Sequence, residues 1–511
     1  MLNVYKAQIY HFISVYTLKA NFSFRDKSCY LVSLEHNMRD SKTYAALSSL
    51  DSYKLNRFIK FLKSPYFNQN EVILLLGELL VQDIKNQNGT SLLEKQVLWH
   101  KLGQKGKYND ARIRSWQAGL LNLFEEFLAQ EFFNERKALK SYYLLESIHK
   151  SKIASLYNSS IKLARVNSAR ALLKDSNYYL NEYLTEFKIH EIQQKELKRF
   201  EKWNMEYISD SLDKFFIIEK LKVFSKALSH QSFINESYKI RFIDTIENFI
   251  TNEELENNPI ISLYYYNLKL LTQKDIEEYF FKYKILLLKH FNDLYLKEGF
   301  ELLFDAINYC IRKLNSGDNK YLEEVFELYK FAIDNEILIR SGEFVHWDYK
   351  NIISIGLRLM KFNWVSHFIE DYKDKIDTLH RNNAYHYNLS NLFFYRKEYN
   401  KVLNTLQKVN YDDLTYSLDA RTLQVATFFE LDELDALTSA LDSFQAFIKR
   451  KNFLSEATQR PYINFIKYTK KIISSYDNSN LLKLKQVLIN TSGIVNKQWL
   501  LQKIEEKIIT K

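Results

Sequence analysis

Turn-forming residues are scarce in this chain, and their scarcity restricts the possible folds more than any other feature. Only ten glycines and three prolines occur in 511 residues. No glycine lies between Gly119 and Gly299, and no proline lies between Pro65 and Pro259. A β-sheet protein needs glycine-type turns about every 8–12 residues, and an α/β fold needs glycine at its tight turns and phosphate loops. The sequence therefore predicts an all-α protein.

The charged residues and the cysteines narrow the class of protein further. The 72 basic and 62 acidic residues give a formal charge of +10, and the two signs are interspersed, which is typical of solvated helix faces. Cys29 and Cys310 are the only cysteines, so we expect neither a disulfide framework nor a cysteine-based zinc site. No apolar run approaches the ~18 residues that a membrane helix needs. We therefore expect a cytoplasmic protein that does not span a membrane.

The first 37 residues have a different character from the rest. The stretch "IYHFISVYTL", Ile9 to Leu18, is similar to the apolar core of a signal peptide. Only Lys6 precedes it, however, and the following "LKANFS" lacks a small-x-small cleavage pattern. The alternative is that Met38 is the natural start and that residues 1–37 are an upstream or disordered extension. In that case no packed element should precede Met38.

The motif "SPYFN" joins two expected helices. Pro65 disfavours the α conformation in the residue before it, so the upstream helix should stop there. With Asn68 as N-cap of the next helix, Glu71 falls at the third helical position and completes a capping box. Phe67 and Val72 would then form the hydrophobic staple. The motif is thus expected to be a helix stop joined to a helix start.

Helical patterning continues on both sides of an expected domain boundary near residue 250. Ser91 and Glu94 have capping-box spacing, and Asn109 or Asp110 should cap a long amphipathic helix. The Asn258–Pro259 pair has the pattern of an N-cap followed by the first helical residue. We expect residues 38–250 to form a helical N-terminal domain.

The C-terminal half contains a repeat. "LSNLFFYRKEYNKVLNTLQKV" starts at Leu389, and "LQVATFFELDELDALTSALDSF" starts 34 residues later at Leu423. Their small and apolar positions match those of a tetratricopeptide (TPR) repeat, with departures at Gln424 and Glu433. A third hairpin precedes them, "IGLRLMKFNWVSHFIEDY". The period predicts a TPR-like α-solenoid over residues 251–511, capped by a C-terminal helix, "KQWLLQKIEEKII".

Three separated stretches resemble signature segments of a known family. They are "FIKFLKSPYFN", "YNDARIRSWQAGLLNLFEEFL" and "FFELDELDALTSALDSFQAFIKRK". The chain from about Met38 to its C-terminus resembles an uncharacterised bacterial family of all-helical, TPR-like proteins. The resemblance implies a fold and supports Met38 as the start, but it implies no catalytic residue.

Motifs for catalysis, cofactors and metals are absent from the sequence. "GQKGKY" lacks the phosphate-loop spacing, and neither a dinucleotide-binding fingerprint nor a G-x-S-x-G motif occurs. "HEIQQ" has Gln194 where a zinc-binding helix needs its second histidine. His346, His367, His380 and His386 are scattered, and Cys310 has the pattern of a core residue. We expect no catalytic residue, metal or cofactor, although an enzyme with an unrecognised site stays open.

The function that the repeat favours is protein–protein interaction. Stacked hairpins present a concave surface on which a peptide or partner helix can bind. By the TPR resemblance, this surface is lined by two sets of residues that recur on successive first helices: Ala384, Tyr387, Asn391, Phe394, Leu418, Arg421, Val425 and Phe428. The partner-binding candidates among them are Tyr387, Asn391, Phe394, Arg421, Val425 and Phe428. The alternative is that these side chains only pack on a neighbouring helix.

A basic segment suggests an alternative function. Five cations lie close together around a predicted helix–loop–helix, with only Asp110 opposing them: Lys101, Lys105, Lys107, Arg112 and Arg114. Such a cluster can contact nucleic acid, although the loop is long for a helix-turn-helix. The alternative function is therefore nucleic-acid binding or regulation through residues 101–114.

Overall fold

The prediction of an all-α protein is confirmed. The computed structural model describes residues 37–86, 93–171, 173–194, 202–231, 237–340, 342–410, 414–450, 455–475 and 477–509. It is 79% helix, and 24 α-helices lie in these ranges. The β-structure there is limited to an antiparallel ladder, β1 (Ile339–Arg340) with β2 (Glu343–Phe344), and two isolated bridges. The expectations for residues 1–36 fall outside the described ranges.

The chain divides into two compact units, with the division between Phe216 and Ile217. This point lies inside a continuous helix, α10 (Met205–Gln231), whereas the boundary expected from the sequence was near residue 250. Because no glycine or proline interrupts α10, the sequence around residue 216 carries no sign of a boundary.

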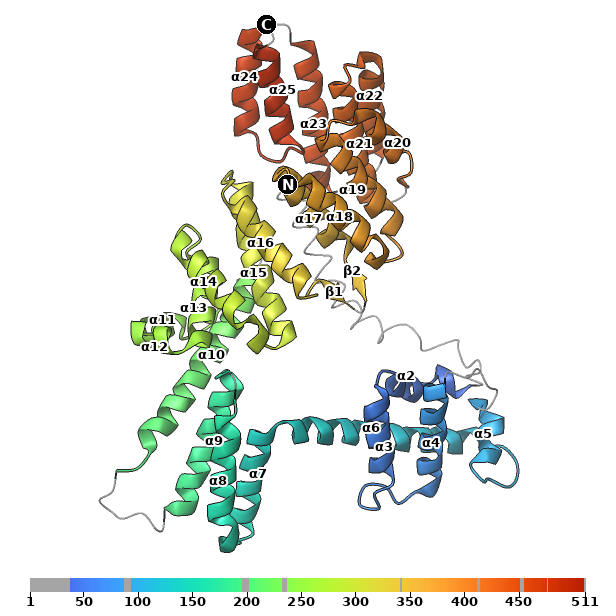
Figure 1. The fold of residues 1–511 in the computed structure, drawn as a ribbon, viewed down its shortest axis with the longest axis vertical. Helices are drawn as coiled ribbons and strands as arrows, with labels where there is room; N and C mark the ends of the chain where they lie inside the picture. The colour runs from blue at the N-terminus through green and yellow to red at the C-terminus, as the bar shows by residue number, and fades with distance from the viewer. Residues whose placement is uncertain are drawn as a thin grey trace. The chain divides into compact units, whose positions relative to one another are not determined.

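The N-terminal unit has two apolar cores. Its helices, ending in the first part of α10, are α2 (Lys42–Ser48), α3 (Ser52–Leu62), α4 (Glu71–Asn86), α5 (Lys95–Lys101), α6 (Asp110–Glu135), α7 (Lys137–Lys150), α8 (Tyr157–Ala169) and α9 (Ser176–Gln193). Helices α2–α6 enclose one core, in which Met38, Phe58 and Leu120 are fully buried. Helices α7, α8 and α9 share a smaller core around Leu145 and Ile189 (Figure 1).

The helix stop at "SPYFN" forms as predicted, but the predicted cap of the next helix is wrong. Helix α3 ends at Leu62, ahead of Pro65. The N-cap of α4 is Asn70, whose Oδ1 accepts hydrogen bonds from the backbone N–H groups of Val72 (3.0 Å) and Ile73 (3.2 Å). Asn68 instead donates from Nδ2 to the carbonyl oxygen of Leu62, at 3.1 Å.

The hydrophobic staple at this junction also differs from the prediction. The ring of Phe67 stacks on Phe61 of the preceding helix, with centroids 4.1 Å apart. Backbone N–H groups of Phe67 and Asn68 donate to the carbonyl oxygen of Ser64 and close a tight turn. This turn brings Phe67 onto α3. With Asn70 as the N-cap, the two staple positions are Gln69 and Leu74, so Phe67 and Val72 no longer occupy them.

Two other predicted helix starts are confirmed. Asn109 caps α6, since its Oδ1 accepts a hydrogen bond from the backbone N–H of Arg112. Asn258 is the N-cap of α13, with Pro259 as the first helical residue. Ser91 lies outside the described residues, and Glu94 precedes α5 without a side-chain cap.

The C-terminal unit is a succession of helices, most of which contact the next helix in the chain. They are α11 (Ile243–Phe249), α12 (Asn252–Asn257), α13 (Pro259–Thr272), α14 (Glu277–His290), α15 (Leu296–Asn315), α16 (Tyr321–Asp334), α17 (His346–Arg358), α18 (Phe362–Tyr372), α19 (Arg381–Tyr395), α20 (Tyr399–Leu406), α21 (Leu414–Glu430), α22 (Leu434–Arg450), α23 (Glu456–Ser474), α24 (Asn478–Asn490) and α25 (Lys497–Ile509). Some helices also contact the next but one in the chain: α17 contacts α19, and α19 contacts α21 (Figure 1).

Three consecutive hairpins turn in the same way. Met360, Lys397 and Asp432 each follow a first helix and have a positive φ of 56°, 62° and 57°. In each turn the N–H of the next residue bonds to the carbonyl five residues back, as Lys361 does with Gly356 at 2.9 Å. These are Schellman motifs, in which a left-handed residue closes the helix. The chain thus makes tight hairpins without glycine at these positions.

Three further features of the C-terminal unit concern its packing: the contact of α17 with α18 at Gly356, the position of α25, and the burial of Cys310. A Cβ at Gly356 would lie 2.6 Å from Cγ2 of Val365, so only glycine lets α17 and α18 approach this closely. The helix predicted at the C-terminal end of the solenoid is present as α25, and Trp499 packs on Phe429 and Phe465. Cys310 is fully buried on α15, as its apolar surroundings predicted.

Candidate functional site

The predicted partner-binding residues lie on α19 and α21 in two different environments. Tyr387 and Val425 are buried, as are Ala384 and Leu418 on the same helix faces. The other four candidates are half-buried: Asn391, Phe394, Arg421 and Phe428. Whether any of the six residues binds a partner stays a prediction, but only the four half-buried side chains reach the surface.

Packing between helices accounts for the buried members. The ring centroids of Tyr387 and Tyr416 are 5.6 Å apart, so Tyr387 fills the space between α19 and α21. Leu418 and Val425 belong to the apolar core that α21 shares with α22–α25. The half-buried residues also contact their neighbours. Phe428 packs against the same core, and the guanidinium of Arg421 lies 4.4 Å from the ring centroid of Phe447. Asn391 Nδ2 donates a hydrogen bond to the Tyr387 carbonyl oxygen (3.2 Å).

Lys350 lies inside a cluster of aromatic side chains that includes Tyr387. The ammonium nitrogen of Lys350, on α17, is 5.2 Å from the ring centroid of Tyr387, 5.6 Å from that of Trp347 and 6.0 Å from that of Tyr416. It also forms an ion pair with Asp419 of α21. Cation–π contact and the carboxylate thus replace the water that the ammonium group loses.

Asp419 connects this lysine to a fourth helix. Its Oδ1 accepts a hydrogen bond of 2.9 Å from the hydroxyl of Tyr462, on α23. The side chains of Lys350 and Asp419 are only 12% and 11% exposed. Burial, with the negative charge of Asp419 next in importance, raises the pKa of Tyr387 and of Tyr462 well above the usual range, so both hydroxyls stay protonated. The cluster therefore links α17, α19, α21 and α23 through side chains.

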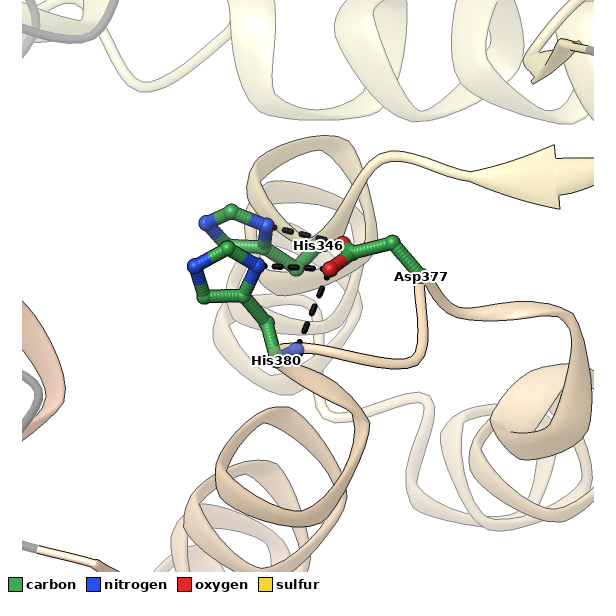
Figure 2. Close-up of side chains that lie close together, drawn as sticks. All are labelled: His346, Asp377 and His380. Carbon is green, nitrogen blue, oxygen red and sulfur yellow. Dashed lines mark hydrogen bonds and ion pairs between the residues drawn. The ribbon is translucent and has the colours of Figure 1, made fainter. Parts of the chain in front are cut away.

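Two histidines and an aspartate meet beside the same helices. The Nδ1 of His346 lies 3.0 Å from Asp377 Oδ2, and the Nδ1 of His380 lies 2.6 Å from Asp377 Oδ1. The imidazole rings stack with centroids 3.9 Å apart, and both turn their Nδ1 toward the carboxylate (Figure 2). The expectation that the histidines are scattered is therefore wrong for this pair. Among the described residues, this is the group whose donor atoms could hold a metal.

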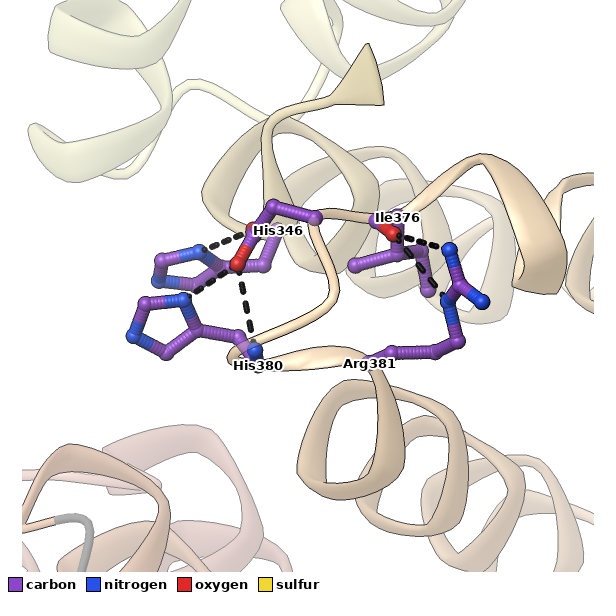
Figure 3. Close-up of polar contacts among 5 residues, drawn as sticks. His346, Ile376, His380 and Arg381 are labelled. Atoms are coloured by element: carbon purple, nitrogen blue, oxygen red, sulfur yellow. Dashed lines mark hydrogen bonds and ion pairs between the residues drawn. The ribbon is translucent and has the colours of Figure 1, made fainter. Parts of the chain in front are cut away.

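The loop that carries Asp377 is held in place by other residues. Arg381 donates from Nε (3.1 Å) and Nη2 (3.0 Å) to the carbonyl oxygen of Ile376, as Figure 3 shows. Ile376 also forms a β-bridge with Phe344 of β2. Burial raises the pKa of Asp377, but hydrogen bonds from His380 and His346 outweigh it, so the pKa is lowered and the carboxylate is ionised.

Sequence reasoning missed this group because its members come from separate segments. His346 begins α17, while Asp377 and His380 lie in the loop before α19 and at its N-cap. The one local signal is the Asp-x-x-His spacing of Asp377 and His380, in which Asp377 Oδ1 also accepts from the His380 N–H (3.1 Å). The helix packing that adds His346 is not visible in the sequence.

The five basic residues of the alternative site are all exposed. Lys101 ends α5, Lys105 and Lys107 lie in the following loop, and Arg112 and Arg114 are in the first turns of α6. Gly103 and Gly106 have positive φ and shape this loop. Arg114 forms an ion pair with Asp110 at 2.9 Å.

No protein-family model matches this chain, and no curated protein matches it either. Within the described ranges, none of the helices has the length and apolar character needed to cross a membrane.

Proposed function

We propose that this protein is a non-enzymatic, cytoplasmic scaffold that binds a peptide or a partner helix on a TPR-like α-solenoid in its C-terminal unit. The resemblance to bacterial TPR-like proteins and the three hairpins with the same turn support the solenoid. The observation that carries the proposal is a row of half-buried side chains on α19 and α21, two helices that contact each other. The row consists of Asn391, Phe394, Arg421 and Phe428.

The residue types in this row suit protein recognition. Aromatic and arginine side chains dominate binding energy at interfaces because they combine large apolar area with specific polar contacts. Phe394 and Phe428 supply such area, and Asn391 and Arg421 supply polar groups. Tyr387 and Val425 would then act by shaping the surface from beneath, since both are buried.

The test uses the full chain as bait in extracts of its native host. We expect Phe394→Asp and Phe428→Asp each to lose a co-purified protein that the wild type retains. Leu434→Asp is the matched control, because Leu434 is 55% exposed on α22, outside the row. Circular dichroism confirms that each variant is folded. If both Phe variants keep the same co-purified proteins as the wild type, the proposal is wrong.

A second candidate function is nucleic-acid binding by the basic loop between α5 and α6. The exposure of all five cations favours it. Each phosphate contact makes the binding constant fall with salt, with a slope of about −0.9 per contact on duplex DNA. We would expect Lys105→Glu and Arg112→Glu to weaken DNA binding and to reduce this slope. Absent or salt-insensitive binding excludes this function.

A further inference from the structure

The donor atoms of His346, Asp377 and His380 lie close together between two chain segments, the start of α17 and the loop that leads into α19. All lie within 4.8 Å of one another, and the two shortest separations, 3.0 Å and 2.6 Å, each join an Nδ1 to a carboxylate oxygen. Because a carboxylate only accepts hydrogen bonds, each imidazole donates its Nδ1 proton to Asp377. The two Nδ1 protons therefore lie along the hydrogen bonds to Asp377 that are drawn as dashed lines in Figure 2.

We propose that His346, Asp377 and His380 bind a divalent transition-metal ion, with Zn²⁺ as the reference case. Bonds of about 2.0–2.1 Å from a tetrahedral Zn²⁺ place its ligand atoms about 3.3 Å apart. The separations of 3.0 Å and 2.6 Å differ from this value by less than about 1 Å. Because the stacked rings lie only 27° from parallel, the two imidazoles must also turn apart for both Nδ1 lone pairs to point at one ion. On binding, each ring loses its Nδ1 proton and takes one on Nε2, so a neutral imidazole remains neutral.

The ligand types select the class of metal. Two imidazole nitrogens and one carboxylate suit Zn²⁺, Co²⁺, Ni²⁺ and Cu²⁺. Ca²⁺ and Mg²⁺ need a shell made mainly of oxygen atoms, which two imidazoles do not provide. The fourth position would be open to water, since Asp377 and His380 are 25% and 28% exposed, whereas His346 is 8% exposed.

The surrounding structure fixes the orientation of the ligands. The His380 N–H holds Asp377 Oδ1, and Arg381 holds the carbonyl of the preceding residue, Ile376 (Figure 3). Such supporting contacts are typical of metal sites, where they set ligand orientation. The two rings stack at 3.9 Å with both Nδ1 atoms on the side of Asp377, so binding would exchange part of this stacking for bonds to the ion. Helices α17 and α19 start at His346 and His380, and the positive ends of their dipoles repel a cation. This repulsion is weaker than the attraction between the ion and its ligand atoms, which act over much shorter distances.

A bound ion would tie α17 to α19. His346 also lies 4.6 Å from Trp347 and 6.0 Å from Tyr416 between ring centroids, so the site adjoins the aromatic cluster around Lys350. The metal site does not depend on the proposed partner, because its ligands are not among the half-buried residues of α19 and α21.

The experiment is calorimetric titration of the metal-free full chain with ZnCl2, with CoCl2 as a spectroscopic probe. We expect one equivalent to bind, the thermal unfolding midpoint to rise, and Co²⁺ to show the visible absorption of nitrogen ligation. Asp377→Asn and His380→Ala should each weaken binding by at least about 100-fold. His367→Ala is the matched control, because His367 is exposed on the neighbouring helix α18, and it should bind as the wild type does.

Both informative variants are at partly exposed positions, so they test the site even if the buried His346→Ala variant fails to fold. Failure to bind one equivalent would overturn the proposal. Binding that Asp377→Asn and His380→Ala leave unchanged would also overturn it, because the ion would then sit elsewhere on the surface. Neither result bears on the co-purification experiment with Phe394 and Phe428.

Discussion

Lys350 and Asp419 form a nearly enclosed ion pair between α17 and α21, surrounded by the rings of Trp347, Tyr387 and Tyr416. A pair of charges removed from water stabilises a fold only when the geometry repays the desolvation of both groups. Here three aromatic ring faces around Lys350 and the hydroxyl of Tyr462, which donates to Asp419, compensate for this desolvation. The pair thus links the first helices of the first and third of the three hairpins, α17 and α21.

We expect Lys350→Met to destabilise the protein by about 3–5 kcal/mol, because it leaves Asp419 buried and unpaired. The double variant Lys350→Met/Asp419→Leu should recover much of this loss, since no buried charge is left. Urea unfolding followed by circular dichroism measures both. Lys282→Ala is the control, because Lys282 forms an exposed i,i+4 pair with Glu278 and should cost less than about 1 kcal/mol. A double variant as unstable as the single one would contradict this account.

Local sequence signals predicted the helices of this protein but not its side-chain clusters. Scarce glycine and proline led to the all-α class, and the cap at Asn109 and the helix start at Pro259 lie where local rules place them. Lys350 and Asp419, in contrast, are 69 residues apart in the chain. Their pairing depends on how hairpins pack, and no short-range pattern encodes that.

The metal-ligand group illustrates the same limit. His346 was predicted to be one of several scattered histidines, yet it stacks on His380 because α17 contacts α19. The cap of α4 shows a second limit of local sequence rules. Asn68 and Asn70 are both eligible caps, and the turn closed on the Ser64 carbonyl decides between them.

The cap of α4 gives a second prediction. Asn70→Ala should destabilise the N-terminal unit by about 1 kcal/mol, since Val72 and Ile73 lose their hydrogen-bond acceptor. Glu71→Ala should have a smaller effect, because Glu71 is exposed and Asn70, not Asn68, is the cap. Thermal unfolding of the two variants beside the wild type decides the matter. A larger loss for Glu71→Ala would restore the capping box predicted from the sequence.

The left-handed residue between α19 and α20 gives a third prediction. A lysine at φ 62° is strained by about 1 kcal/mol or more, and glycine is not. Glycine also makes the unfolded chain more flexible, which offsets part of the gain. We therefore expect Lys397→Gly to raise the unfolding midpoint slightly.

The same substitution within a helix is the matched control for Lys397. Lys401→Gly, in the exposed first turns of α20, should lower stability by up to about 1 kcal/mol. Opposite signs for the two lysines would support the Schellman turn. A loss at both positions would show that Lys397 is not strained.

Asp305 gives the last prediction, a dependence of stability on pH. Its carboxylate accepts hydrogen bonds from Ser229 Oγ and Asn267 Nδ2, both at 3.2 Å. Burial raises its pKa from 3.8 to about 6, against the opposing effects of these two hydrogen bonds and of Arg312, and with a small contribution from Glu301. The folded protein therefore binds a proton between about pH 4 and pH 6 that the unfolded chain does not.

Stability should consequently fall as pH rises from about 4 to 6 and level off above that, by as much as about 3 kcal/mol from this group. Other groups titrate in the same range, so the measurement compares wild type with Asp305→Asn, which cannot ionise. The difference in unfolding free energy, wild type minus variant, should decrease from pH 4 to pH 6 and stay constant from pH 6.5 to pH 8. Parallel curves for the two proteins would mean that the folded state does not perturb Asp305.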